Sequence, residues 1–188
     1  MPLLADPPTD EVTQAACVLL GRALYIASEF EGDCRSLAFV LKVREPQSEE
    51  QSDDQFFQAL SKAVLGRLVD LNKHIARRAK LKQSYAEMLH AARDARNYIA
   101  HEATSDLERL IKLPDGFAQW QSILASKLED VAFGQIIVAV LLSRNSAEAT
   151  PTHAGIDSYP KKVASWVFES DAQPCGRAAL NVEHPLPC

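Results

Sequence analysis

Apolar residues recur at three- and four-residue spacing along most of the chain, a pattern that predicts helices. The first such stretch follows Thr9-Asp10, a predicted helix N-cap, and we expect Glu31-Gly32-Asp33 to break it. Its apolar positions are Val12, Ala15, Ala16, Leu19, Leu20, Ala23, Leu24 and Ile26. A shorter apolar run, Leu37 to Val43, is closed by Pro46. It fits a helix or a strand, and a helix is the preferred interpretation.

Two more helices are predicted on either side of a basic segment. The polar, acidic stretch Glu45 to Asp54 is interpreted as a loop whose end caps a helix from Phe56 to Leu71. The segment from Asn72 to Lys82 has no acidic residue and carries Lys73, His74, Arg77, Arg78, Lys80 and Lys82. The next helix is expected to begin near Ser84, with Glu87 in capping-box spacing. Its apolar face comprises Met88, Ala92, Ala95, Ile99 and Ala103.

The remaining pattern completes a helical bundle. Helical character is expected to continue through Leu107–Ile111 to a turn at Pro114-Asp115-Gly116, and the most apolar helix spans about Phe117 to Ser143. Beyond Arg144 the sequence is polar and rich in proline, and the mixed segment Lys162–Glu169 receives no assignment. The prediction is an all-α, four- to five-helix up-and-down bundle over residues 1–143, with a mostly irregular C-terminal extension over residues 144–188.

Composition narrows the class of protein. The 188 residues, 47% of them hydrophobic, suffice for one domain with a core. The most apolar segment, Val131 to Leu142, is too short to span a membrane, and Met1-Pro2-Leu3-Leu4 does not resemble a signal peptide, so a cytoplasmic protein without membrane association is expected. The 4 cysteines show neither Cys-x-x-Cys nor zinc-ligand spacing, so no metal, cofactor or disulfide is expected. The net charge of -5 argues against indiscriminate nucleic-acid binding, although the basic segment shows that charge is unevenly distributed.

The segment Arg96-Asn97-Tyr98-Ile99-Ala100-His101 places a cation, an amide and an imidazole within two helical turns. A core helix has little structural use for this set, whereas a phosphodiester site needs a phosphate-binding cation and a proton-transfer group. On an ideal helix Arg93, Asn97 and His101 share a stripe, while Arg96 lies about 140° from His101. Arg96 and His101 therefore do not converge easily within one chain, which favours a site shared by two copies across a two-fold axis. Asn97 would orient the Arg96 or His101 side chain.

This segment resembles the Arg-x4–6-His signature of the HEPN superfamily (higher eukaryotes and prokaryotes nucleotide-binding domains), which lies on a late helix of a helical bundle. The resemblance covers roughly residues 10–143 and implies a metal-independent endoribonuclease that acts as a homodimer. His101 would be the general acid or base for the ribose 2′-hydroxyl or the leaving 5′-oxygen, Arg96 would bind the phosphate, and Asn97 would position one of them. The acid or hydroxyl that many relatives supply from another helix is not assignable from this sequence. A toxin or phage-defence role, with an antitoxin as partner, is a further implication.

The basic segment suits an RNA substrate, for which Lys73, Arg77, Arg78 and Arg93 are the candidate binding residues. The alternative for the basic segment is a solvated helix end. Tyr98 fits either a base-stacking role or a core or dimer-interface position. Two other functions remain open: a non-catalytic HEPN-like domain that binds RNA, a nucleotide or a protein, and a plain helical interaction protein.

Overall fold

The computed structural model describes residues 10–43, 75–146 and 149–169. Within these residues the chain is helical and none is in a β-strand. The helices are α1 (Glu11–Val43), α4 (Gln83–His101), α5 (Ala103–Leu110), α6 (Gly116–Asn145) and α7 (His153–Phe168), with one further helical turn at residues 75–78. The predicted helix from Phe56 to Leu71 lies outside the described residues, as does Lys73.

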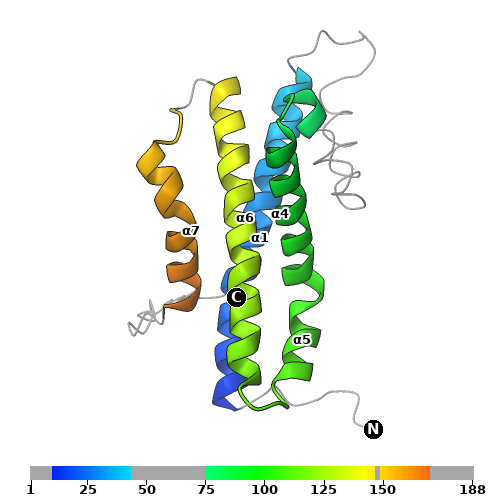
Figure 1. Cartoon of the computed structure of the whole chain (residues 1–188), viewed down its shortest axis with the longest axis vertical. Helices are drawn as coiled ribbons and strands as arrows, with labels where there is room; N and C mark the ends of the chain where they lie inside the picture. Colours follow the sequence, from blue (N-terminus) through cyan, green and yellow to red (C-terminus); the bar gives the residue numbers. More distant parts are fainter. Residues whose placement is uncertain (1–9, 44–74, 147–148, 170–188) are drawn as a thin grey trace, which may run out of the picture.

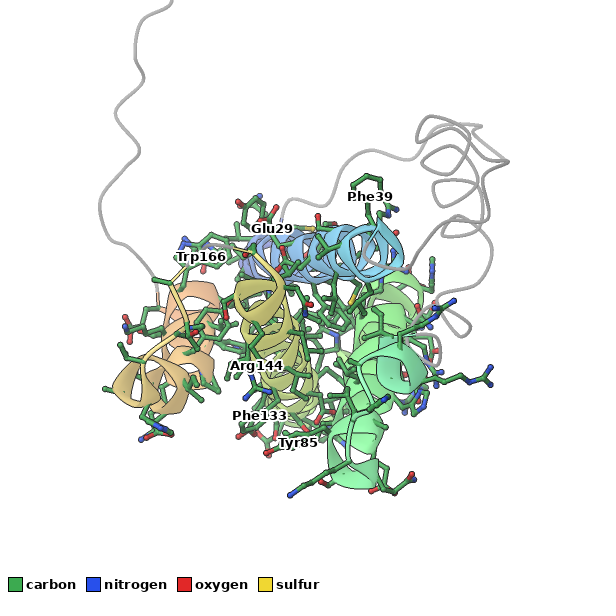
Figure 2. The ribbon with its side chains drawn as sticks, turned by 90° about the horizontal axis from the view of Figure 1, so that it is seen from above. Glu29, Phe39, Tyr85, Phe133, Arg144 and Trp166 are labelled. Carbon is green, nitrogen blue, oxygen red and sulfur yellow. The ribbon has the colours of Figure 1, made fainter. Side chains whose placement is uncertain are left out.

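The helices alternate in direction along the bundle (Figure 1). α1 runs upward in this view, α4 and α5 run downward, α6 runs upward and α7 returns downward. Seen from above, α7, α6 and α4 stand side by side and α1 lies across α6 and α4 (Figure 2). The predicted all-α up-and-down bundle is therefore confirmed. No described helix combines the length and the apolar character that crossing a membrane requires.

Helix α6 is the centre of the bundle, because it packs against α1, α4, α5 and α7. Its buried apolar residues recur at helical spacing, which confirms the predicted apolar helix; they include Trp120, Leu124, Leu128, Val131 and Val138. The Trp120 indole donates a 2.8 Å hydrogen bond to the Ala103 carbonyl. Where α6 meets α1 and α4, Gly134 allows close approach: a Cβ there would lie 2.4 Å from Ala92 Cβ and 2.8 Å from Phe30 Cε2.

Helix α1 is one continuous helix, so the predicted break at Glu31-Gly32-Asp33 is wrong. Asp10 caps it as predicted, because the Asp10 Oδ1 atom accepts a 2.7 Å hydrogen bond from the Thr13 N–H. Glycine in a helix interior costs only about 1 kcal/mol relative to alanine, less than the packing of the flanking turns contributes. Phe30, Cys34 and Leu37, on both sides of Gly32, are fully buried. The preferred helical interpretation of Leu37–Val43 is confirmed.

Helix α4 is the motif helix, because it carries Arg96–His101, and it begins at Gln83, close to the expected start near Ser84. The predicted capping box is wrong: the N-cap is Lys82, without a side-chain cap, and Glu87 instead accepts a 2.9 Å hydrogen bond from the Gln83 side-chain amide. Helical structure does continue to Leu110, but Glu102 separates α4 from α5. The predicted turn before α6 is confirmed: Asp115 adopts a left-handed conformation, with φ 55°. Only glycine fits next, because a Cβ on Gly116 would lie 1.7 Å from the Leu110 carbonyl oxygen.

The expectation that residues 144–188 are mostly irregular is wrong for the described part of that segment, most of which is helix α7. The Thr152 hydroxyl caps α7 by accepting a 3.1 Å hydrogen bond from the Gly155 N–H. Pro160 lies inside the helix, where its missing N–H removes one backbone hydrogen bond. Packing compensates for that loss, since Val163 and Val167 are buried in the common core.

A second contact anchors the end of α7 to the bundle. The Arg22 guanidinium, on α1, donates to the carbonyl oxygens of Trp166, Val167 and Glu169 at 3.1, 3.3 and 2.9 Å. These carbonyls lack helical partners because they belong to the last turn, so a cation satisfies both their hydrogen-bonding capacity and the helix dipole. The Trp166 ring also packs against Tyr25 of α1, with centroids 5.7 Å apart.

Candidate functional site

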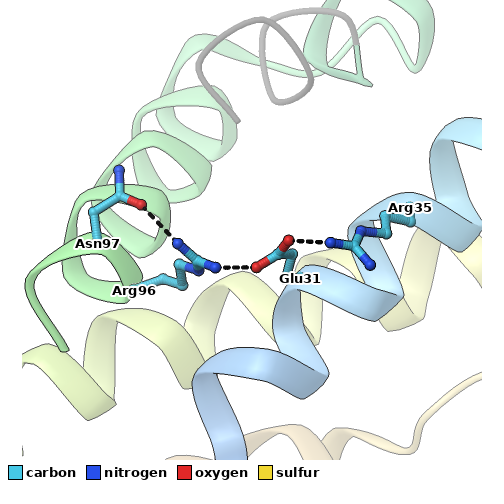
Figure 3. A network of polar contacts seen from close by, with 4 residues as sticks. All are labelled: Glu31, Arg35, Arg96 and Asn97. Atoms are coloured by element: carbon cyan, nitrogen blue, oxygen red, sulfur yellow. Dashed lines mark hydrogen bonds and ion pairs between the residues drawn. The ribbon is translucent and has the colours of Figure 1, made fainter. Parts of the chain in front are cut away.

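The Arg96 side chain points from α4 towards α1, where it forms an ion pair with the Glu31 carboxylate (Figure 3). A second nitrogen of the same guanidinium donates a 3.2 Å hydrogen bond to the Asn97 Oδ1 atom. Asn97 thus makes the contact with Arg96 that the sequence suggested. With two of its nitrogens engaged, Arg96 is held in one orientation at the edge of the core, where its side chain is 19% exposed.

Glu31 is the residue that sequence reasoning missed. It lies in the stretch predicted to break the helix, yet it is one of the few buried polar residues within the described parts of the chain. Its second carboxylate oxygen pairs with Arg35, one turn further along α1. It is an acidic residue on a different helix from Arg96, and its carboxylate contacts the Arg96 guanidinium. Had the helix been predicted to continue through Gly32, its periodicity would have placed Glu31 on the side of α1 that faces the core.

The cluster of Glu31, Arg35 and Arg96 carries two cations and one carboxylate, and therefore a net positive charge (Figure 3). Arg35 is the more exposed of its cations, with 43% of its side chain accessible. The Arg35 Nε atom is buried and has no hydrogen-bond partner within the described parts of the chain. The cluster can accept an anion without losing its internal ion pairs, since each guanidinium has five N–H donors.

Arg93 has a different environment from Arg96. It forms an ion pair with Asp94 at 2.7 Å and a 3.3 Å contact between its Nη1 atom and the His90 Nδ1 atom. Its side chain is 15% exposed. The predicted stripe of Arg93, Asn97 and His101 therefore does not present three equivalent groups to a substrate: Arg93 is partly neutralised by its neighbour on the same helix.

His101 is the last residue of α4 and is exposed. Within the described residues it makes no hydrogen bond or ion pair. Arg96 is turned towards α1, so the two motif groups have different surroundings, as the helix angle predicted. An exposed imidazole at a helix end is available to a ligand or to a second copy of the chain.

Tyr98 is a core residue, so the base-stacking alternative is wrong. It is 8% exposed, and its hydroxyl donates a 2.9 Å hydrogen bond to the Asp106 carboxylate of α5. Burial and this hydrogen bond raise the pKa of the Tyr98 hydroxyl. The Lys127 ammonium lies 5.7 Å from the ring centroid. Tyr98 therefore joins α4, α5 and α6 and fixes the end of the motif helix.

The described part of the basic segment lies at the other end of the motif helix from His101. Arg77 is exposed and Arg78 half-buried, both on the helical turn before α4. The 19-residue helix α4 rises roughly 27 Å from its first residue to His101. Within one chain, the structure thus brings Arg96 and Asn97 together with Glu31 but does not bring Arg77 or Arg78 to His101.

The chain was compared with protein-family models, curated proteins and solved structures, and none of the three comparisons found a match.

Proposed function

We propose that this chain is a metal-independent endoribonuclease of the HEPN type, with Arg96 and His101 as its reacting groups. The observation that carries the proposal is the orientation of Arg96 by Glu31 and Asn97, one and a half turns before an exposed histidine. A phosphate-binding arginine must be held in place before the substrate arrives, because pre-organised charge stabilises a transition state without reorganisation. The Glu31 contact supplies that restraint from a second helix.

The reaction uses the substrate's own ribose. His101 removes the 2′-hydroxyl proton, the 2′-oxygen attacks the adjacent phosphorus, and the 5′-oxygen of the next nucleotide leaves with a proton. The products are a 2′,3′-cyclic phosphate and a 5′-hydroxyl end. Arg96 stabilises the negative charge that builds on the non-bridging oxygens.

A homodimer is part of the proposal, because two proton transfers are needed and one chain offers one histidine in the motif. The exposed position of His101 at the end of α4 leaves it able to face its counterpart across a two-fold axis. One imidazole then acts as base and the other as acid. Arg77 and Arg78 bind phosphates further along the strand, and an antitoxin that covers this surface is the corresponding partner.

The test is cleavage of single-stranded RNA by purified protein in EDTA. We expect His101→Ala and Arg96→Ala each to reduce the rate by about 100-fold or more, as removal of a general acid–base or an oxyanion-stabilising group does. His153→Ala, an exposed histidine at the start of α7, is the matched control and should retain full activity. RNA with 2′-deoxy nucleotides should resist cleavage. Undiminished cleavage by both motif variants refutes the assignment.

One observation favours a second candidate, a non-catalytic domain that binds RNA, a nucleotide or a protein. The charge of Arg96 is already paired with Glu31, and most of its side chain is shielded from solvent. This arrangement suits a structural cation as well as a catalytic one. Binding of labelled RNA without turnover, weakened by Arg35→Ala as much as by Arg96→Ala, distinguishes this function from the ribonuclease.

A further inference from the structure

A pocket lies on the opposite side of α6 from the motif helix, between α1, α6 and the N-terminal half of α7. Its volume is about 360 Å³, within the range of small-molecule sites. Its walls combine apolar side chains, Ile136, Ala139 and Ile156, with Asp33, Gln135 and Tyr159. None of the Arg96–His101 motif residues lines it.

The pocket exists because α7 is held to the bundle mainly at its far end. Val163 and Val167 are the buried residues of α7, and both lie after Pro160. Before Pro160 every described residue of the helix is at least partly exposed. Gly155 adds no side chain to fill the space. The N-terminal half of α7 thus covers α1 and α6 without packing tightly against them.

Asp33 gives the pocket an uncompensated negative charge. It forms no ion pair or hydrogen bond within the described residues, and burial together with the nearby Glu29 raises the pKa of its carboxyl group. The same two carboxylates contribute to the raised pKa of the Tyr159 hydroxyl on α7, after burial itself, so their field reaches across the pocket. Lys162 also lines the pocket, but its side chain is exposed and does not pair with Asp33.

Gln135 adds a buried side-chain amide whose hydrogen-bond donors are not used within the described residues. It is 6% exposed, and its Oε1 atom accepts a 3.0 Å hydrogen bond from the Tyr159 hydroxyl. Its Nε2 atom makes no hydrogen bond to another described residue. The Tyr159 ring lines the same pocket, and aromatic faces attract ammonium groups. The Asp33 carboxylate, the Tyr159 ring and the apolar wall together offer the contacts that an organic cation needs: an opposite charge, an aromatic face and an apolar surface.

We propose that this pocket binds a small organic ammonium ion with a short apolar body. Asp33 neutralises the ammonium, Tyr159 contacts it with its ring and Ile136, Ala139 and Ile156 enclose the apolar body, while the Gln135 amide donates to any acceptor that the ligand carries. This site is independent of the proposed ribonuclease, since it shares no residue with the motif and lies on the other side of α6.

The test compares three probes of nearly equal size by isothermal titration calorimetry on the full chain: phenethylamine, the neutral phenethyl alcohol and the anionic hydrocinnamate. The expected result is that the amine binds at least about tenfold more tightly than the other two, since a hydrogen bond to a charged group is the difference between them. Equal affinities, or no binding of the amine, overturn the proposal.

Asp33→Asn should weaken amine binding by about tenfold or more. The matched control is Asp157→Asn, which removes the same charge from an exposed position on α7 outside the pocket and should leave the affinity unchanged. Thermal denaturation shows whether Asp33→Asn is folded, which we expect because it removes an unpaired, half-buried charge. Unchanged affinity in folded Asp33→Asn, or an equal loss in both variants, overturns the assignment of Asp33.

Discussion

Gly134→Ala is expected to destabilise the bundle because the added methyl group has no room. Its Cβ would lie 2.4 Å from Ala92 Cβ on α4 and 2.8 Å from Phe30 Cε2 on α1. Carbon atoms in contact prefer separations of about 3.5–4.0 Å, so the helices must part by about 1 Å. Neither neighbour can move aside, because the Ala92 methyl is fixed to the backbone and Phe30 is fully buried.

Two opposing terms set the magnitude. Overpacking of a core costs roughly 1–3 kcal/mol, and a rigid site belongs at the upper end of that range. Replacing glycine by alanine in a helix interior returns about 1 kcal/mol through the backbone. The net expectation is a loss of about 2 kcal/mol in the free energy of unfolding. At Gly21, where no atom lies within 4 Å of the added Cβ, only the favourable term applies.

Urea denaturation followed by far-ultraviolet circular dichroism measures both changes. Gly21→Ala is the matched control and should gain up to about 1 kcal/mol. Ala92→Gly should lose about 1 kcal/mol alone but recover part of the stability lost in Gly134→Ala when the two are combined, since it removes the nearer clash. If Gly134→Ala is as stable as Gly21→Ala, the close packing of α6 against α1 and α4 is refuted.

Three further changes test other contacts. Glu31→Gln should cost about 3 kcal/mol of unfolding free energy, because it leaves the Arg96 charge unpaired near the core. Arg35→Gln should cost at most about 1 kcal/mol, because the Arg35 side chain is more exposed. Denaturant titration measures both losses, and equal losses contradict the reasoning. Asp33 has a raised pKa in the folded state, so its ionisation lowers stability as pH rises past the usual aspartate value of 3.8. Asp33→Asn should therefore be more stable than the parent at neutral pH, and the gap should close as the pH falls towards 3.8; a constant gap in unfolding free energy argues against this origin. Cys34 is fully buried, and burial together with Asp33 and Glu31 raises the pKa of its thiol. Iodoacetamide should therefore label the exposed Cys17 and spare Cys34 until denaturant is added, which site-resolved mass spectrometry measures. Rapid labelling of Cys34 without denaturant contradicts its burial.

Periodicity was sufficient to predict α4 and α6, because both bury a continuous apolar stripe. Glycine and proline, taken as signals that end a helix, gave wrong predictions at two places where packing outweighs them. Gly32 favours a break in the sequence pattern, yet α1 continues through it, because Phe30, Cys34 and Leu37 on both sides of it are buried in the core. Pro160 and Pro151 marked the extension as irregular, yet α7 forms because two buried valines and the Arg22 contacts anchor it.

The candidate site was also predictable only in part. The different directions of Arg96 and His101 depend on helix geometry within one short segment, so they can be predicted from the sequence alone. The pairing of Arg96 with Glu31 joins residues on two helices and depends on how α1 and α4 pack, which periodicity does not specify. The pocket at Asp33 arises from loose packing of α7 and has no sequence pattern of its own.

The central place of α6 has a consequence during synthesis of the chain. Phe30 and its neighbours on α1 emerge from the ribosome about 100 residues before the α6 residues that cover them, including Gly134. At translation rates of about 5–20 residues per second, the apolar face of α1 waits for roughly 5–20 s without its final partner. Nascent chains that end before α6 should therefore be bound by chaperones that recognise exposed apolar helices, and release should coincide with completion of α6.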